Sequence, residues 1–337
     1  HRRRKHRVVL LCYRMPLIIN GVVLDQVPES TSIFFQRFPF FKETASALCA
    51  VLPKIIGPIG LLYLHNREYA ITVPQDKNIT ILGTDGATCR MIVVLRHSGS
   101  GAVGLGHFDT CGYEKGIEGL IEKVESLSSG YEGRMELSLI GGYTDKRGYS
   151  EYLALLLLHT FNKQAYPIEL VMTCVVECNT ILREGINWPI IYGIGVNIKT
   201  GELFPASFPE KGPDLGLRCT RLYGGCYEMQ DIYDWHHGLL RIGPIIYAPW
   251  RVEIILNEPD DFILQYLSLS PEVESPNFVM DVRSALEHMQ KHRYPEVSLF
   301  SDNQPRYYTR DENGVWRRFR CGVQHVNNQT SFKYDGS

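Results

Sequence analysis

A cysteine and a histidine within one glycine-rich stretch are the residues of this sequence best suited to chemistry. Cys89 follows a polar turn and precedes a run of β-branched residues, and His107 comes eighteen positions later. If the intervening strand and its glycine-rich return form a hairpin, His107 comes back beside Cys89. A cysteine next to an imidazole is an activated nucleophile, and a carboxylate such as Asp109 can orient the ring. The stretch therefore predicts covalent catalysis by Cys89, His107 and Asp109.

Other interpretations of these residues stay open at this point. A free cysteine is among the most buried residue types and usually packs as a small hydrophobic side chain. His97, at the end of the same predicted strand, is a rival base. Glu177, Asn179 and Asn197 lie within or beside apolar strands, where a polar group must be hydrogen-bonded or functional. These three residues are candidate walls of a site.

Three further motifs resemble binding sites but lack parts that such sites need. Residues 99–104 match G-x-G-x-x-G after a predicted strand, but a dinucleotide site also needs a helix to begin there, and none is predicted. Cys174 and Cys178 lack the further ligands of a tetrahedral metal set. The pair His236-His237 is typical of a solvated surface. We expect no nucleotide, metal or other cofactor.

The composition is that of a folded chain with a distinct basic end. The 337 residues are 44% hydrophobic and 21% charged, with a formal net charge of −2, which gives no general attraction to nucleic acid. Residues 1–14 hold six basic and no acidic side chains, and we expect this leader to lie outside the fold, with Met15 as the natural start. No run reaches the ~20 apolar residues of a membrane helix. Nine scattered cysteines without a secretory signal favour a reducing compartment.

Short strands outnumber helices in the predicted set of elements. Runs of apolar and β-branched residues predict strands at 60–65, 69–73, 92–96, 190–198, 203–207 and 252–256, the first two joined as a tight hairpin. Helical spacing of apolar residues predicts helices at 117–127, 150–162 and 280–292. Because regular β–α–β alternation is missing, we expect an α+β fold with a mainly antiparallel sheet. A single domain over residues 15–315 and a polar, loosely ordered tail over 316–337 complete the prediction.

Several stretches of the chain together carry a family resemblance. They are residues 85–89, 92–97 and 106–109 in the glycine-rich segment, and 60–63, 141–145, 189–200, 206–208 and 240–244 elsewhere. In combination these stretches resemble the protein N-terminal asparagine amidohydrolase family. The likeness runs, with gaps, from about Met15 to Trp316.

This resemblance implies a reaction and a fold. The family converts the side-chain amide of an N-terminal asparagine in a protein to aspartate and releases ammonia, and the product enters the N-degron pathway of protein degradation. It uses a cysteine nucleophile and no cofactor, in a layered α/β/β sandwich that resembles bacterial cysteine deamidases. The implied partners are proteins and peptides with N-terminal asparagine, and the implied location is the cytoplasm or the nucleus.

The resemblance also assigns roles in the reaction. Cys89 is the implied nucleophile, which forms a thioester that water then hydrolyses, and His107 is the implied general base. Asp109, Asp85 and Thr80 are candidates for the residue that orients the ring of His107.

Binding roles follow from the same resemblance. The backbone around Asp85 to Cys89, with Thr88 in it, is the expected oxyanion hole and substrate contact. An acidic residue must hold the α-ammonium group of the substrate, because that group distinguishes an N-terminal from an internal asparagine. Asp85 and Glu177 are the candidates.

One position departs from the family pattern. The family has two threonines before its cysteine, whereas this chain reads Ala87-Thr88-Cys89-Arg90-Met91. Counting without gaps from either side puts Arg90 at the cysteine position. A one-residue shift turns a strand side chain to the opposite face. Either a bulge restores the aim of Cys89, or Arg90 is an error in the gene sequence, or the chain is a weakened or inactive relative that binds protein N-termini without catalysis.

Overall fold

An eight-stranded mixed sheet runs through the middle of the molecule. The structure is a computed structural model and describes residues 16–319. The strand order is β15 (Gln230–Asp231), β5 (Glu68–Thr72), β8 (Val103–Phe108), β7 (Met91–His97), β9 (Met135–Gly141), β10 (Ile168–Val175), β1 (Ile18–Ile19) and β2 (Val22–Val23). The central strands β7 and β8 form the predicted hairpin around the glycine-rich return.

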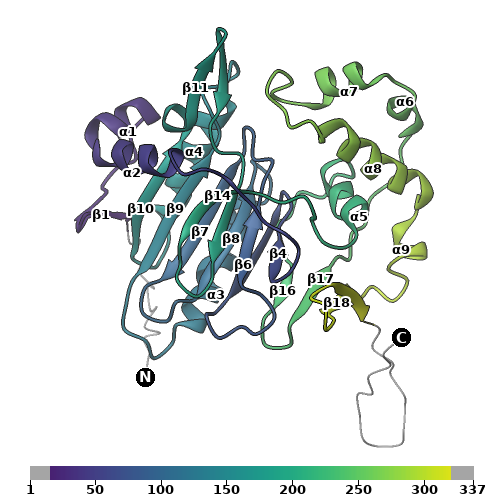
Figure 1. Cartoon of the computed structure of the whole chain (residues 1–337), viewed down its shortest axis with the longest axis horizontal. Helices are drawn as coiled ribbons and strands as arrows, with labels where there is room; N and C mark the ends of the chain where they lie inside the picture. The colour runs from purple at the N-terminus through teal and green to yellow at the C-terminus, as the bar shows by residue number, and fades with distance from the viewer. Residues whose placement is uncertain (1–15, 320–337) are drawn as a thin grey trace, which may run out of the picture.

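A second sheet packs on one face of the first (Figure 1). Its order is β3 (Lys54–Ile55), β14 (Leu203–Ser207), β13 (Ile194–Asn197), β6 (Ile81–Thr84) and β4 (Leu61–Tyr63). Leu82 and Ile194 from this sheet share a buried cluster with Ile92 and Val94 from β7. Such sheet-on-sheet packing buries alternate side chains of both sheets between them.

Helices cover the opposite face of the large sheet. They are α1 (Thr31–Arg37), α3 (Tyr113–Leu127) and α4 (Tyr149–Phe161). The helix α2 (Phe40–Cys49) lies over β10 on the face that the small sheet also covers, where Leu48 joins the cluster between the sheets. Ile117, Leu120 and Val124 of α3 are fully buried against Val93 and Leu95 of β7, so the predicted helical spacing is confirmed there. The layer order is therefore helices, large sheet, small sheet. Ten of the fifteen strand pairings within residues 16–319 are antiparallel, in agreement with the predicted α+β class.

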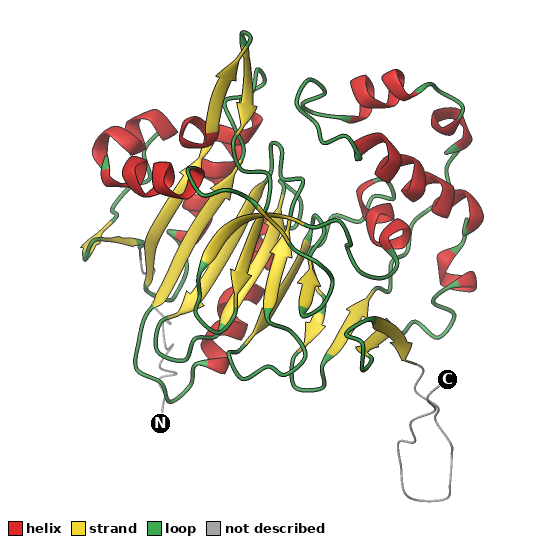
Figure 2. Cartoon of the chain, in the orientation of Figure 1, coloured by secondary structure: helices red, strands yellow, loops and turns green. Residues whose placement is uncertain are grey.

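The C-terminal part adds a second group of helices, which Figure 2 shows in red on the far side from α1 and α2. It contains α5 (Leu215–Cys219), the 3₁₀ turn η2 (Thr220–Leu222) that directly follows it, α6 (Glu253–Leu256), α7 (Asp260–Leu267), α8 (Phe278–Lys291) and α9 (Pro295–Ser298). A further 3₁₀ turn, η1 (Val176–Asn179), follows β10. A small sheet of β16 (Tyr233–Asp234), β17 (Leu239–Ile242), β18 (Arg306–Arg310) and β19 (Trp316–Phe319), and the hairpin of β11 (Thr180–Arg183) with β12 (Ile186–Pro189), complete the fold.

Three sequence predictions differ from the structure. The strands β4 and β5 do not form a hairpin, because β4 pairs with β6 in the small sheet and β5 pairs with β8 in the large one. The run 252–256 is the helix α6 rather than a strand, since a short apolar run does not distinguish the two. The first residues of the predicted tail form β19, which pairs with β18.

The ends of the chain are described only in part. The predicted leader 1–14 and residues 320–337 of the predicted tail lie outside the described residues. No helix within residues 16–319 is long and apolar enough to span a membrane.

Candidate functional site

A pocket of about 430 Å³ lies where the two sheets meet the C-terminal helices. Its walls come from β4, β8 and β14, from the loop after β6, and from α5 and α8. Many of the lining side chains are titratable or charged: Tyr63, His65, Asp85, Arg90, His107, Lys211, Arg218, Cys219, Glu274 and Asp281. A pocket of this size with convergent polar groups is the natural candidate for a binding or active site.

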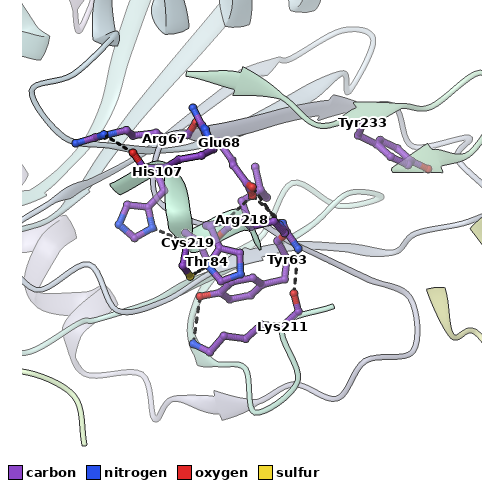
Figure 3. Close-up of polar contacts among 12 residues, drawn as sticks. Tyr63, Arg67, Glu68, Thr84, His107, Lys211, Arg218, Cys219 and Tyr233 are labelled. Atoms are coloured by element: carbon purple, nitrogen blue, oxygen red, sulfur yellow. Dashed lines mark hydrogen bonds and ion pairs between the residues drawn. The ribbon is translucent and has the colours of Figure 1, made fainter. Parts of the chain in front are cut away.

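His107 on β8 lines this pocket with a defined proton arrangement. Its Nδ1 lies 2.7 Å from the Thr84 hydroxyl oxygen (Figure 3), and that hydroxyl also lies 2.7 Å from the carbonyl oxygen of Leu64. Thr84 has one hydroxyl proton and donates it to Leu64, so His107 Nδ1 must carry the ring proton. The Nε2 atom is then a bare acceptor, and it has no hydrogen-bond partner in the described part of the chain.

The surroundings of the pocket keep its histidines neutral. Burial, and then the positive charge of Arg90, lowers the pKa of His107 to about 3. Burial, and then Arg218, also holds the pKa of His65 well below its usual value. Both rings therefore stay uncharged at physiological pH and act as hydrogen-bonding groups.

The structure does not bring Cys89 to His107. Cys89 is 4% exposed and packs with Tyr143 and Val273 in a cluster separate from the pocket. Burial raises the pKa of the Cys89 thiol to about 11, so little thiolate forms at neutral pH. The only side-chain partner recorded for the His107 ring among residues 16–319 is Thr84. The expected cysteine–histidine pair is therefore absent from this conformation.

Arg90, directly before β7, lies on the same face of the large sheet as His107 of β8. Ile92 lies opposite His107 in the β7–β8 register, so these two side chains share one face of the sheet. Because side-chain direction alternates along a strand, Arg90 points to the same face as Ile92 and lines the pocket. Cys89 points to the other face, as does Met91, whose side chain packs under the helices. Since β7 pairs with both neighbours without a break in register, no bulge within the strand turns Cys89 towards the pocket.

Asp109 does not touch the ring of His107. Its carboxylate is held by Arg67 at 2.8 Å and by Asn66 at 2.9 Å. Burial alone would raise the pKa of Asp109, but Arg67 and other donors hold it below its usual value. The group that orients His107 is the hydroxyl of Thr84, which sequence analysis did not single out.

The predicted substrate-binding residues occupy three different positions. Asp85 lines the pocket, but its carboxylate already accepts from Lys211 at 2.6 Å and from a tyrosine hydroxyl at 2.7 Å. Thr88 is buried and donates to the lining residue Glu274 at 3.0 Å. Glu177 lies on η1, outside the pocket, and accepts from a threonine of α1 at 2.7 Å.

Several lining residues escaped sequence analysis, among them Glu274, Asp281 and Cys219. Glu274 accepts from two hydroxyl groups at 2.6 and 3.0 Å. Asp281 on α8 has no side-chain partner among residues 16–319, and burial raises its pKa. Cys219 on α5 lies 3.9 Å from Nδ1 of His65, and burial raises the pKa of its thiol to about 12. No motif marks these residues, because each gains its chemical neighbours only through the fold.

The remaining sequence motifs do not contribute to the pocket. The stretch 99–104 runs from a turn into β8 rather than into a helix, as the argument against a dinucleotide site predicted. His97, at the far end of β7, accepts from the backbone of Ser100 at 3.0 Å. Cys174 is buried beside Cys49, with 3.6 Å between the two sulfur atoms. Among residues 16–319, no group of three or more histidine, cysteine or acidic side chains is placed to hold a metal ion.

Comparison with known proteins agrees with the resemblance found in the sequence. The family model described as protein N-terminal asparagine amidohydrolase matches residues 52–318. The chain is 40% identical to the human protein of that name over 306 residues, which cover 90% of this chain and 98% of the relative. It is 39% identical to the pig protein over 91% of this chain and 99% of the relative. The Arabidopsis thaliana protein of the same name is 28% identical over 76% of this chain and 80% of the relative.

These matches define the class of protein: a family of hydrolases that act on a linear amide. The chain belongs to the protein N-terminal asparagine amidohydrolase family.

Proposed function

We propose that this pocket receives the N-terminal residue of a protein and that the chain binds it without forming a cysteine thioester. The observation that carries the proposal is the placement of two neighbouring side chains. Arg90 lines the pocket with His107, while Cys89 is buried outside the pocket. Attack on an amide carbon needs a nucleophile within about 3–3.5 Å. Binding needs only complementary groups, and the pocket supplies them.

The groups that suit a free amino terminus are acceptors. Asp281 is a carboxylate without a side-chain partner, and the Nε2 atom of His107 is a bare acceptor. Glu274 uses one lone pair on each carboxylate oxygen for a hydroxyl and keeps the others. An α-ammonium group has three N–H donors, and charge-assisted hydrogen bonds to such acceptors are the strong ones. A terminus blocked by acetylation would lose them.

A second candidate function is the hydrolysis that the names of the relatives describe. It is favoured by the 40% identity to the human amidohydrolase over 98% of that relative and by the free lone pair of His107 in the pocket. In this reaction the Cys89 sulfur attacks the carboxamide carbon of asparagine, His107 moves the thiol proton to the departing ammonia, and water hydrolyses the thioester to aspartate. Residues 88–90 would have to shift so that Cys89 replaces Arg90 in the pocket.

One assay separates the two candidate functions. Three synthetic peptides, identical after a first residue of Asn, Gln or acetylated Asn, are tested for binding by calorimetry and for ammonia release. We expect the peptide with free N-terminal Asn to bind about tenfold or more tighter than its acetylated form, with no ammonia released. Cys89→Ser should leave this binding unchanged.

Turnover is the result that would overturn the non-catalytic proposal. Ammonia release from the Asn peptide that is lost in Cys89→Ser would establish Cys89 as the nucleophile. Release that survives Cys89→Ser but is lost in Cys219→Ser would assign the reaction to the thiol that lines the pocket. Binding of free and acetylated peptides alike would remove the amino terminus from the proposal. A role in the N-degron pathway, in the cytoplasm or nucleus, is part of this proposal for either candidate.

A further inference from the structure

Arg90 places a positive charge in the pocket that no contact compensates. Its side chain makes no hydrogen bond or ion pair within residues 16–319. The two other basic lining residues are both paired: Lys211 with Asp85 at 2.6 Å, and Arg218 with Glu68 at 2.7 Å. Arginine stays charged under all physiological conditions, and a charge withdrawn from water is costly unless an opposite charge accompanies it. The place beside Arg90 therefore suits an anionic group of a ligand.

The nearest carboxylates do not fill this place. Asp109 and Glu274 act on Arg90 through their charge, but Asp109 is paired with Arg67 at 2.8 Å, and Glu274 accepts from two hydroxyl groups at 2.6 and 3.0 Å. Asp281 lines the same pocket without a side-chain partner in the described part of the chain. An unpaired cation and an unpaired carboxylate thus line one pocket without meeting each other.

We propose that the pocket selects protein N-termini that begin with aspartate. The side-chain carboxylate of the ligand pairs with Arg90, and its α-ammonium group donates to Asp281 and to the bare Nε2 of His107. This inference rests on the proposed function, since it assigns the residue type that an N-terminus-binding pocket takes. Aspartate is what hydrolysis of the asparagine amide yields, so this chain would bind the product of the reaction that its relatives are named for.

Hydrogen-bond chemistry distinguishes the two ligands. A guanidinium presents two parallel N–H donors that match the two oxygen atoms of a carboxylate. A carboxamide offers one oxygen and an NH₂ group that is itself a donor, so one donor of Arg90 stays unpaired and its charge stays uncompensated. Hydrolysis of a neutral amide, by contrast, requires a thiol nucleophile at the position that Arg90 occupies. The arginine therefore converts a position for attack into a position for carboxylate recognition.

The test compares ligands that differ only in their first group. Peptides beginning with Asp, Asn or acetylated Asp, and free L-aspartate, are titrated into the full chain by calorimetry at low ionic strength. We expect the Asp peptide to bind about 30-fold or more tighter than the Asn peptide. Acetylation should weaken binding, and free L-aspartate should bind more weakly than the peptide.

Variants assign the preference to the guanidinium. Arg90→Gln should abolish the difference between Asp and Asn peptides, and Arg90→Lys should keep part of it, because an ammonium retains the charge but not the bidentate fork. Arg96→Gln, on β7 and outside the pocket, is the matched control and should keep the full difference. Thermal melting of each variant shows whether it is folded.

The outcomes separate this inference from the proposed function. If no peptide with a free amino terminus binds, the proposed function itself fails. If Asn and Asp peptides bind equally, or if a folded Arg90→Gln variant keeps the preference, the inference fails and the proposed function stands. Binding of free L-aspartate in preference to every peptide would also overturn the inference.

Discussion

Side-chain direction alternates along β7, and this alternation decides whether Cys89 or Arg90 shares the pocket with His107. The hairpin register fixes Ile92 opposite His107, so residues two apart from Ile92 share its face and odd-numbered neighbours face the helices. Thr84 holds His107 in the tautomer with a free Nε2. The base is therefore in place, and the residue aimed at it is a cation rather than a thiol.

Moving the cysteine one position along the chain, from 89 to 90, should create amidohydrolase activity. In the double variant Cys89→Thr/Arg90→Cys, the thiol takes the place of the guanidinium in the pocket with His107. Loss of the Arg90 charge also removes one of the causes that lower the pKa of His107, so the ring becomes a better base. We expect ammonia release from a peptide with N-terminal Asn at about 10²-fold or more above the unaltered protein, measured by an ammonia assay and by mass spectrometry.

The single variant Arg90→Ala is the control for this double variant. It empties the same position but leaves Cys89 in its buried cluster, so it should gain no activity. A double variant that binds the Asn peptide yet releases no ammonia would show that direction of the thiol is not the missing element. Activity in Arg90→Ala equal to that of the double variant would show that Cys89 reaches the pocket once the arginine is gone.

At the scale of elements, the sequence predicts a helix or strand best where apolar residues recur along one face over several turns or residues. The buried positions of α3 and the return of β7 into β8 follow from spacing alone. The sequence also predicts the turn between β4 and β5, but a turn motif is local and does not show that the chain passes from one sheet to the other there. The helix α6 was missed because its apolar run is too short to show a period.

The candidate site was predictable only in part. Residue type and spacing indicate Cys89 and His107, and the family pattern indicates that Arg90 departs from it. Asp281 and Glu274 come from a helix and a loop more than 160 positions after the hairpin. No sequence periodicity brings such residues together, since their approach depends on how the C-terminal helices pack against the sheets.

A buried ion pair ties the C-terminal helices to the large sheet. Arg218 on α5 donates to both carboxylate oxygens of Glu68 on β5, at 3.0 and 2.7 Å, and to the Tyr63 carbonyl at 2.7 Å (Figure 3). Both side chains are 2% exposed or less. We expect Glu68→Gln to lower the free energy of unfolding by about 3–5 kcal/mol, because it leaves a buried guanidinium without its counter-charge. Urea unfolding at pH 7 measures the change.

Replacing both members of this pair is the informative control. A Glu68→Gln/Arg218→Met double variant removes the uncompensated charge and should recover part of the lost stability. If Glu68→Gln is as stable as the unaltered protein, the pair does not hold α5 to the sheet.

On the scale of the whole molecule, one hydrophobic core joins the two sheets to the C-terminal helices. Ile92 of the large sheet and Ile194 of the small one share a buried cluster with Leu286 of α8. The pocket lies at this junction and takes lining residues from all three parts. Anything that loosens the C-terminal helices should therefore weaken ligand binding as well as the fold.

Acid should destabilise the whole fold through its buried neutral histidines. Burial lowers the pKa of His107 to about 3 and that of His288 to about 4, against about 6.5 in an unfolded chain. Below pH 6.5 the unfolded state binds protons that the folded state refuses. The stability that these rings support is complete above that pH and is lost as the pH falls towards the folded values. Asp281, whose pKa burial raises, acts in the opposite direction.

The size of this effect follows from proton linkage. Between pH 7 and pH 5, His107 should remove about 2 kcal/mol from the free energy of unfolding, as measured by urea unfolding at several pH values. The half-buried His288 should remove less, because water screens its charge. In His288→Gln, which lies outside the pocket, the pH dependence should flatten by about one proton, while peptide binding at pH 7 stays unchanged. Equal stability of the unaltered protein at pH 7 and pH 5 would mean that these rings are protonated in the folded state. The free lone pair assigned to His107 would then be lost already at mildly acidic pH, and the ammonium contact argued from it would have to come from Asp281 alone.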